Sequence, residues 1–503
     1  MSNNRFSVIH TLLVFSVVFC LALSLGFSQE TKAVTTTHLT ILYDNDLHGH
    51  LLPFDDSRNG KNIGGAARRT SLMLQLKKEN PDTLILDAGD LLSGTPISGL
   101  FKGEVDFGTF ERMPYDAMVI GNHDFDYSQA TLRHFIKTCK TPVLSANIIE
   151  SDGQTLMATP YIIKTFGDLT IAIIGITTPT TPITTHPKNV VGLTFAQPEA
   201  TMEKYLPELK KKSDLVIALT HIGFQEDKDL AKNVNGIDVI VGGHSHTKVD
   251  SYEKVNGTII VQDFQWGINL GKLDLSIVDK KIVDAHAELM PITSALSEDS
   301  AIAAYLQPYA AKIIDKMNTV VGRTQFILDK PSSRHPQTNL ANWLADVFRE
   351  RMHADIAMQN TGGTRASLNA GNITYNDLYS VLPFENTLVL LEAKGDLVQK
   401  IMDNLAEKLH KATETASVSG VSFFVNDEGK ALNIKIDGKP LDTSTTYTIA
   451  VNDFMANGGS GFSLLKEAKV IRYDDNLRDV VIDYLKEHPV IAPVDQERIE
   501  VKD

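Results

Sequence analysis

Cysteine is scarce in this sequence, which holds only Cys20 and Cys139 among its 503 residues. Cys20 lies in an N-terminal segment that we expect to be removed, so the mature chain would keep one cysteine and form no internal disulfide. A chain of this length can bury enough surface to fold without cross-links. The shortage of thiols also disfavours a structural zinc cage, so any metal site here must use nitrogen and oxygen ligands.

Net positive charge is missing as well. The chain has 62 acidic residues against 48 lysines and arginines, a formal net charge of −14. Such a field repels polyanions, so we expect no nucleic-acid partner, while a small phosphorylated substrate would need concentrated local positive charge. The sequence has no internal repeat and no low-complexity tract, and its 43% hydrophobic and 22% charged content is typical of a globular protein.

Long apolar runs are confined to the N-terminus, where residues 8–27 are mostly hydrophobic and follow Arg5. The small residues around Gly26 and Ser28 have the spacing that signal peptidase prefers, so we predict a signal peptide over residues 1–28. A retained signal anchor is the alternative, because the run is close to membrane-spanning length. We expect a periplasmic or secreted, bacterial protein with no stable membrane insertion.

Residues 36–296 alternate short apolar runs with helical stretches. The helical stretches cover residues 66–79 and 200–212. The apolar runs lie at 39–43, 83–87, 117–120, 169–176, 215–220 and 237–243. Continuous apolar strands that alternate with helices predict an α/β domain whose sheet is covered on both sides.

A change of pattern marks the second half of the chain. Residues 297–318 read as one connecting helix with Ser297 as its N-cap. Residues 319–503 then combine a helix at 338–353, a glycine-rich loop, and strands at 419–426, 433–438 and 446–453. We therefore predict a second domain of the α+β class.

Polar side chains follow five of the six apolar runs in the first domain. They are the residues of DNDLHGH (44–50), Asp90, GNHDFD (121–126), His221 and HSH (244–246), whereas the run at 169–176 ends in Thr-Thr-Pro. A single Asp or His after a strand is usually a turn former or a cap. Binding groups gather beyond the carboxyl ends of strands in open α/β sheets, so five such loops together predict one site.

The residue types of this group indicate metal chemistry. Imidazole and carboxylate ligands suit zinc, manganese, iron or cobalt, and the number of ligands exceeds the needs of one ion. We expect two divalent metal ions (zinc, manganese or cobalt), with Asp90 as the natural bridge. Two such ions roughly 3.5–4 Å apart would hold a hydroxide and clamp a phosphoryl group. His50 is expected beside the site or at the surface, and His38, His134 and His186 are expected to be structural.

The order of these motifs resembles the calcineurin-like metallophosphoesterases, whose signature is D-x-H, GD, GNH(D/E), a lone His and GHxH. The resemblance implies a four-layer α/β/β/α sandwich. It also implies two metal sites with a shared aspartate: Asp46, His48, Asp90 and His246 for the first metal, and Asp90, Asn122, His221 and His244 for the second. His123 and Asp126 match the catalytic dyad of that superfamily, while Asp124 matches no ligand or catalytic position.

Three further motifs resemble the secreted 5'-nucleotidase and UDP-sugar hydrolase family over nearly all of the mature chain: NTGGTR (360–365), LPFENT (382–387) and NDFMANGGSGF (452–462). The resemblance implies that Phe384 and Phe454 sandwich the base. It also implies that Arg334 and Arg365 contact phosphates or ribose, and that Asn360 is a polar substrate contact.

One position departs from that family. Its members usually carry Gly-Gly-Asp-Gly, and the aspartate binds the ribose hydroxyls, whereas this chain has Ser460 within Gly458–Gly461. A serine is shorter and neutral, so from this position alone we expect looser recognition of ribose.

The expected activity is hydrolysis of nucleoside 5'-monophosphates to nucleoside and phosphate. Alternatives on the same scaffold are hydrolysis of nucleotide sugars or of nucleoside di- and triphosphates, cleavage of 2',3'-cyclic nucleotides, and thiosulfohydrolase or protein phosphatase chemistry. A periplasmic nucleotide-binding protein without turnover is the non-enzyme alternative. The complete ligand set and the intact His123–Asp126 pair favour an enzyme.

Overall fold

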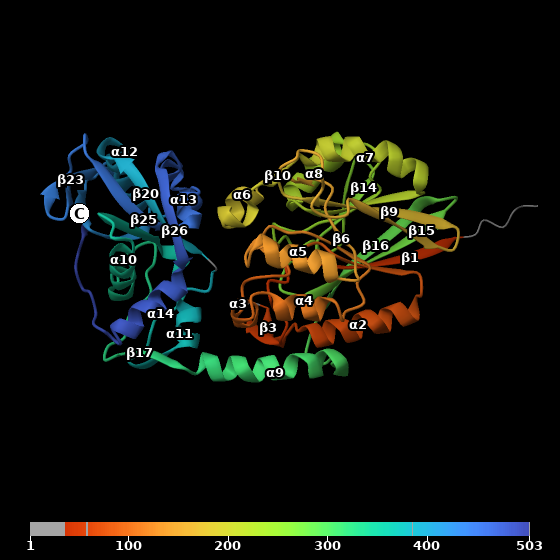
Figure 1. Ribbon diagram of the computed structural model, residues 1–503, viewed down its shortest axis with the longest axis horizontal. Helices are drawn as coiled ribbons and strands as arrows, with labels where there is room; N and C mark the ends of the chain where they lie inside the picture. The colour runs from red at the N-terminus through yellow and green to blue at the C-terminus, as the bar shows by residue number, and fades with distance from the viewer. Residues whose placement is uncertain (1–35, 57–58, 385, 502–503) are drawn as a thin grey trace, which may run out of the picture.

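The computed structural model describes residues 36–56, 59–384 and 386–501, so the predicted signal peptide lies outside the described residues. These residues form two domains joined by one helix, α9 (Ser300–Met317), which runs along the lower edge of Figure 1. None of the helices in the described ranges is both long enough and apolar enough to cross a membrane.

The first domain is built on two six-stranded sheets with strand orders β16-β15-β1-β4-β5-β6 and β13-β14-β12-β11-β9-β8. The first sheet contains β1 (Thr37–Asp44), β4 (Thr83–Asp87), β5 (Ala117–Val119), β6 (Val143–Leu144), β15 (Asn269–Val278) and β16 (Lys281–Pro291). The second contains β8 (Tyr161–Phe166), β9 (Leu169–Thr177), β11 (Leu215–His221), β12 (Val239–Val241), β13 (Glu253–Val255) and β14 (Thr258–Val261). All six predicted apolar strands are therefore present.

The two sheets pack face to face, and helices cover both outer faces. Ile41 and Leu86 of the first sheet share a buried core with Ile173 and Leu219 of the second. The outer face of the first sheet lies under α2 (Ala66–Glu79), α3 (Pro96–Leu100), α4 (Glu104–Phe110), α5 (Gln129–Thr138) and α9. The outer face of the second lies under α7 (Pro198–Lys212) and α8 (Phe224–Asn233). This confirms the four-layer α/β/β/α sandwich, and burial of both faces explains why the strands read as continuous apolar runs.

The connecting helix begins later than the sequence led us to expect. Asp299, and not Ser297, is its N-cap, and the Asp299 carboxylate accepts hydrogen bonds from the backbone N–H groups of Ala301 and Ile302. A carboxylate at this position satisfies free N–H groups and also complements the helix dipole. The Ser297 hydroxyl instead hydrogen-bonds the Ser71 hydroxyl at 2.8 Å.

Helix α9 packs on the first domain. Ile302, Leu306 and Met317 are buried in the core shared with α2 to α4. The ring of Tyr305 lies 3.9 Å beneath the guanidinium of Arg112, which follows α4. The chain therefore leaves the first domain only after α9 ends.

The second domain combines helices with three small sheets, which confirms the α+β prediction. Its central sheet has the order β21-β18-β25-β20-β26, with β18 (Ile356–Asn360), β20 (Thr387–Lys394), β21 (Ala416–Ser419), β25 (Thr446–Asn452) and β26 (Lys469–Asn476). Helices α10 (Asn339–Met352), α11 (Tyr375–Val381) and α14 (Leu477–Glu487) cover one face, and α12 (Gly395–His410) covers the other. Helix α10 matches the helix predicted at 338–353, and Thr338 is its N-cap.

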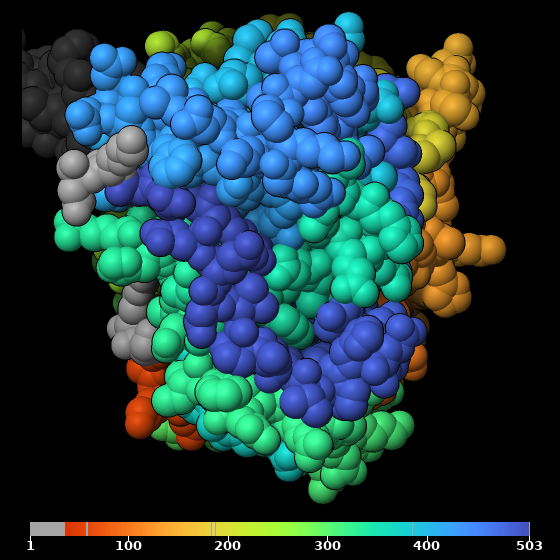
Figure 2. Space-filling view, turned by 90° about the vertical axis from the view of Figure 1, so that its left-hand side faces the viewer, coloured from red at the N-terminus to blue at the C-terminus, as the bar shows by residue number. Residues whose placement is uncertain are grey.

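The C-terminal segment ties the two smaller sheets of this domain together. Strand β27 (Val490–Ile491) pairs with β17 (Val320–Thr324), and β28 (Ile499–Val501) pairs with β22 (Val421–Val425). Figure 2 shows this dark blue segment crossing the outer face of the domain. The other strands of these two sheets are β19 (Gly371–Thr374), β23 (Ala431–Ile436) and β24 (Lys439–Pro440).

Candidate active site

The seven predicted metal ligands lie at the carboxyl ends of β1, β4, β5, β11 and β12: His221 is the last residue of β11, and the other six lie in the loops that follow the strands. Strands β1, β4 and β5 are parallel neighbours, and β11 and β12 are parallel neighbours in the second sheet. Their carboxyl ends therefore meet at one edge of the sandwich, where binding groups gather in such folds. Strand β9, which carries no candidate ligand, ends nearby at Thr177, whose backbone N–H donates to Asn147.

One group of ligands consists of Asp46, His48 and His246, whose ligating atoms lie within 4.8 Å of one another. The Nε2 atoms of His48 and His246 are 3.1 Å apart. Nε2 of His246 lies 3.2 Å from Oδ1 of Asp46. The three side chains thus place one potential metal-ligating atom each around a common point.

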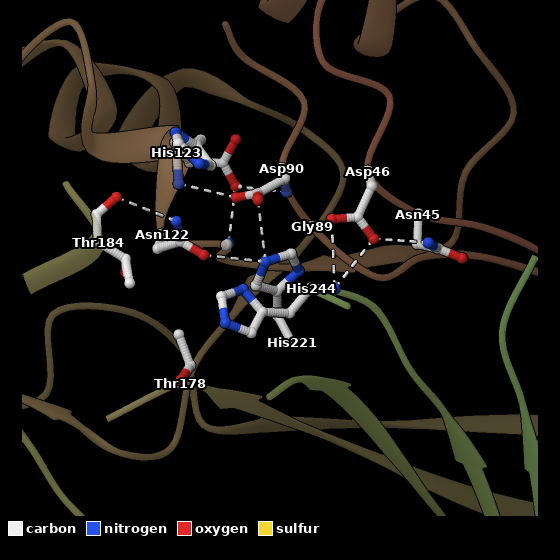
Figure 3. Close-up of polar contacts among 12 residues, drawn as sticks. Asn45, Asp46, Gly89, Asp90, Asn122, His123, Thr178, Thr184, His221 and His244 are labelled. Atoms are coloured by element: carbon white, nitrogen blue, oxygen red, sulfur yellow. Dashed lines mark hydrogen bonds and ion pairs between the residues drawn. The ribbon is translucent and has the colours of Figure 1, made fainter. Parts of the chain in front are cut away.

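The second group consists of Asp90, His221 and His244, again within 4.8 Å of one another. Nε2 of His221 lies 3.0 Å from Oδ2 of Asp90 and 3.2 Å from Oδ1 of Asn122. Figure 3 shows Asp90, Asn122 and His244 around His221. The side-chain oxygen of Asn122 adds a neutral donor to this group.

Asp90 lies between the two groups. Its Oδ2 atom is 3.0 Å from Nε2 of His221 and 3.8 Å from Nε2 of His48. Its Oδ1 atom accepts a hydrogen bond from the backbone N–H of His123 at 2.8 Å, which fixes the direction of the carboxylate. The Asp90 carboxylate therefore lies within 4 Å of one histidine from each group.

Backbone carbonyls set the orientation of two of the histidines. Nδ1 of His48 lies 3.2 Å from the carbonyl oxygen of Leu92, and Nδ1 of His221 lies 2.7 Å from that of Ala88. A carbonyl accepts only from a protonated Nδ1, so in each neutral ring Nε2 carries the lone pair and faces the ligand group.

The backbone itself is unusual at the ligands. Five of the seven adopt positive φ: Asp46 (52°), His48 (45°), Asp90 (60°), His244 (79°) and His246 (50°). Residues other than glycine rarely adopt this region, and such strain concentrates at functional sites. This backbone conformation was not predictable from the residue types, since none of the five is glycine.

The electrostatics of the group favour cations. Burial opposes ionisation of Asp90, yet the neighbouring His221 and His123 hold its pKa well below the usual range. Burial lowers the pKa of His48 to about 4, so this imidazole stays neutral at neutral pH. Burial opposes the charged form of His221, but the charge of Asp90 outweighs it and raises the pKa of His221 to about 9, so this imidazole would release a proton on binding a cation. Carboxylate oxygens and imidazole nitrogens together form a set of ligands that fits divalent metal ions.

The predicted His123–Asp126 pair lies beside the metal ligands. Nδ1 of His123 is 2.8 Å from Oδ2 of Asp126, and its ring centroid is 5.2 Å from that of His48. Burial opposes the charged form, but the negative charges of Asp126 and Asp90 outweigh it and raise the pKa of His123 to about 10. Asp126 also accepts hydrogen bonds from Ser93 Oγ at 2.5 Å and from Thr185 Oγ1 at 2.8 Å.

Asp124, to which the sequence assigned no role, ties two ligand loops together. Its carboxylate accepts hydrogen bonds from the backbone N–H groups of Gly121 (2.8 Å), Leu91 (2.9 Å) and Asp90 (3.3 Å). Asn122 adjoins one end of this network, and Asp90 lies at the other. Aspartate is common in turns after strands, so no sequence signal distinguished Asp124 from an ordinary turn residue.

Asn45 is a second supporting residue that sequence reasoning did not single out. Its side-chain amide donates to Oδ2 of Asp46 at 2.6 Å and to the carbonyl of Phe264 at 2.8 Å. His50 lies beside the site, with its ring stacked on that of Trp266 at 4.9 Å. The backbone N–H of Trp266 donates in turn to the carbonyl of Asp46 at 2.8 Å.

The predicted nucleoside contacts lie in the second domain. Phe384 and Phe454 are 49% and 48% exposed, which is high for phenylalanine. Nδ2 of Asn360 donates to Oγ of Ser460 at 3.2 Å. Nδ2 of Asn386 donates to Oδ1 of Asp453 at 2.8 Å, which links the loop of Phe384 to α13 (Asp453–Ala456), the helix of Phe454.

This face of the second domain looks toward the first. Figure 1 shows α13 turned toward α6 (Thr181–Thr184) of the first domain, and the rings of His186 and Tyr473 meet nearby, with centroids 4.7 Å apart. Burial chiefly, with the charge of Asp126 among the smaller causes, raises the pKa of Asp453 to about 6. The aromatic residues and the dyad therefore belong to facing surfaces.

The two predicted arginines have free guanidinium groups among the described residues. Arg334 and Arg365 are both exposed. Across the described ranges, neither guanidinium takes part in any of the hydrogen bonds or ion pairs that the structure shows. Both are available to a substrate anion.

A two-sheet α/β sandwich with two groups of imidazole and carboxylate side chains beyond its strand ends has the arrangement of a metallophosphoesterase domain. Residues 39–248 match the family model described as calcineurin-like phosphoesterase, and residues 320–467 match that of the 5'-nucleotidase C-terminal domain. The chain is 32% identical to Protein UshA of Yersinia enterocolitica, over 91% of this chain and 92% of that protein.

Two further relatives are both named 5'-nucleotidase. A 5'-nucleotidase of Vibrio cholerae is 32% identical over 91% of each chain. The crystal structure of a 5'-nucleotidase precursor from Thermus thermophilus is similar with a TM-score of 0.71 and 31% identity, over 93% of this chain and 100% of that chain. The chain therefore belongs to the 5'-nucleotidase family of metallophosphoesterases.

The role of Asp124 can be tested by substitution. Asp124→Asn leaves one acceptor oxygen for three backbone donors, so the loops of Asp90 and Asn122 should lose their common anchor. We expect the affinity for Mn²⁺ to fall about 10- to 100-fold, the usual cost of losing a group that holds metal ligands in place. Isothermal titration calorimetry on the metal-stripped protein measures it.

The matched control for this variant is Asp152→Asn. Asp152 is exposed and also accepts backbone hydrogen bonds, from Gln154 and Thr155, but lies on a surface turn. Equal Mn²⁺ affinity in Asp124→Asn and Asp152→Asn would show that Asp124 does not support the ligands.

Proposed function

We propose that this protein hydrolyses nucleoside 5'-monophosphates to nucleoside and inorganic phosphate. The observation that carries the proposal is the shared position of Asp90 between two ligand groups, 3.8 Å from His48 and 3.0 Å from His221. The family supports it, since relatives named 5'-nucleotidase cover almost the whole chain. The exposed aromatic residues of the second domain supply the affinity for a nucleoside.

The assigned ligands divide into two sets that share Asp90. One metal ion would be held by Asp46, His48, Asp90 and His246, and the other by Asp90, Asn122, His221 and His244. Zinc, manganese or cobalt suits these ligands. When bound, such cations supply Lewis-acid chemistry, in which water is made more acidic and the charge of the phosphoryl oxygens is neutralised.

His123 provides positive charge and a proton at the reacting group. Asp126 holds Nδ1, so the Nε2–H of the imidazolium is directed away from Asp126. As water attacks phosphorus and the bond to the 5' oxygen breaks, this Nε2–H would donate to the leaving oxygen or to a phosphoryl oxygen. Ser93 and Thr185 keep Asp126 in place for this task, as an aspartate orients histidine in hydrolase triads.

The second domain would bind the rest of the nucleotide. Phe384 and Phe454 would stack on the two faces of the base. The carbonyl of Phe384 accepts a hydrogen bond from Arg478 at 3.0 Å, which holds its loop. Arg334 and Arg365 would contact phosphates or ribose, and Asn360 and Ser460 would lie at the sugar.

Nucleotide sugars and nucleoside di- or triphosphates are a second group of candidate substrates. Arg334 and Arg365 are exposed and could bind an additional phosphate, because a guanidinium matches phosphate oxygens in geometry and charge. Cleavage would still require the metal ligands and His123.

The mature protein is proposed to act in the periplasm or outside a bacterial cell, after removal of residues 1–28. The description of the Thermus thermophilus relative as a precursor supports this. The domain limits proposed from the sequence, 36–296, 297–318 and 319–503, are supported by the matched ranges 39–248 and 320–467 and by helix α9 between them.

Metal removal tests the activity. With Mn²⁺ or Zn²⁺ present, the protein should release phosphate from AMP, and excess EDTA should abolish this release until metal is restored. A colorimetric phosphate assay measures it. Bis(p-nitrophenyl) phosphate, a 2',3'-cyclic nucleotide and thiosulfate are the comparison substrates. Binding of AMP with no turnover on any substrate would favour a nucleotide-binding protein and contradict the proposal.

Substitution of His123 tests whether His123 acts in catalysis while Asn122 binds metal. His123→Ala removes the proton donor and leaves all proposed metal ligands, so kcat for AMP should fall about 10²- to 10⁴-fold. Metal content, measured by plasma mass spectrometry, should stay at two ions per chain. Loss of both metals in this variant would show that His123 serves the metal site instead. Asn122→Ala is the paired variant, and it should lose metal.

A further inference from the structure

A carboxylate from a different loop occupies the neighbourhood of Ser460. Oε1 of Glu414 accepts a hydrogen bond from Oγ of Ser460 at 2.6 Å and another from Nδ2 of Asn360 at 3.1 Å. Glu414 lies just before β21, about fifty residues from both partners along the chain. Its carboxylate therefore stands among the residues already assigned to the nucleoside.

The amide of Asn360 is oriented so that it donates to this carboxylate. Oδ1 of Asn360 accepts a hydrogen bond from Nδ2 of Asn452 at 2.8 Å, so Nδ2 of Asn360 is directed toward Glu414. Asn452 is also the N-cap of α13, where its Oδ1 accepts from the backbone N–H of Met455. One chain of hydrogen bonds thus connects Glu414 to the helix that carries Phe454.

Two glycines keep this region open. A β-carbon on Gly362 would lie 2.2 Å from Oε1 of Glu414, and one on Gly459 would lie 2.5 Å from the ring of Phe454. Neither glycine has a positive φ, so conformational freedom is not the reason for their presence. A side chain at Gly362 would make the Glu414 carboxylate shift from its present position.

The second carboxylate oxygen is free to bind. Both hydrogen bonds that Glu414 receives from described residues end on Oε1, and the side chain is exposed. Nothing basic pairs with it in the described part of the chain, as no ion pair there includes Glu414. An anionic acceptor beside a nucleoside-binding aromatic residue calls for a ligand with hydroxyl donors.

We propose that Glu414 binds the 2' and 3' hydroxyls of the substrate ribose, and so takes over the task for which Ser460 is too short. The proposal rests on the proposed function, since it requires a nucleoside at this site. Oε1 of Glu414 already accepts two hydrogen bonds, but Oε2 keeps two lone pairs. A ribose presents two neighbouring O–H donors, so Oε2 can accept charge-assisted hydrogen bonds from both. The protein should therefore discriminate ribose from deoxyribose, contrary to the expectation from Ser460 alone.

The test compares kcat/KM for AMP and for 2',3'-dideoxy-AMP in the parent, Glu414→Ala and Glu414→Gln. Hydrogen bonds to a charged group are worth enough that Glu414→Ala should lower kcat/KM for AMP roughly 10- to 100-fold. The value for the dideoxy substrate should change less than about 3-fold on the same grounds, since it lacks both donors. For Glu414→Gln, kcat/KM for AMP should lie between the values of the parent and of Glu414→Ala.

A rescue variant and a control complete the design. In Glu414→Ala/Ser460→Asp, an aspartate at position 460 should restore much of the preference for AMP. Ser460 has a φ of 51°, a region in which Asp is tolerated better than most residues. The control is Glu428→Ala, an exposed glutamate between β22 and β23, which should leave both values unchanged.

Two outcomes overturn the proposal: equal losses for both substrates in Glu414→Ala, or a parent with no preference for AMP over its dideoxy analogue. If the parent releases no phosphate from AMP, the proposed function fails, and Glu414 is then judged by calorimetric binding of adenosine and 2',3'-dideoxyadenosine. A preference for adenosine that disappears in Glu414→Ala supports the role. A preference that persists, or no binding of either nucleoside, overturns it.

Discussion

The active site depends on one carboxylate that must serve two ligand groups at once. Oδ2 of Asp90 lies within 3.8 Å of a histidine from each group, while Oδ1 is held by the backbone N–H of His123. A buried carboxylate in such a position needs both positive neighbours and a rigid support. The protein supplies rigidity through the three hydrogen bonds of Asp124, which join the loops after β4 and β5.

A second set of buried polar and charged groups, near the start of the Asp46 loop, connects helix α2 to strand β1. Arg69 of α2 is buried and pairs with Asp44 at 3.0 Å, and Oη of Tyr115 donates to the same carboxylate at 2.6 Å. Asp44 ends β1, directly before the loop of Asp46. The outer helix layer is thus connected to the strand end that precedes Asp46 and His48.

The sequence predicted the strands, the second domain and the convergence of the ligand loops, because continuous apolar runs and polar strand ends are local patterns. It did not reveal that the strands form two sheets until the motif order was compared with a family. It placed the cap of α9 at Ser297, two residues before the capping side chain, Asp299. The sequence did not reveal the contacts of Asp124 with Leu91 or of Glu414 with Ser460, because these residues are distant in sequence and such contacts follow only from the fold.

The central claim is that two cations are bound on either side of Asp90. The most direct measurement is anomalous X-ray scattering from crystals of the protein loaded with Mn²⁺. If the proposed ligands bind two ions, two anomalous peaks should appear roughly 3.5–4 Å apart with the Asp90 carboxylate between them, as in other two-metal sites. A single peak, or two peaks of which neither contacts Asp90, would contradict the central claim.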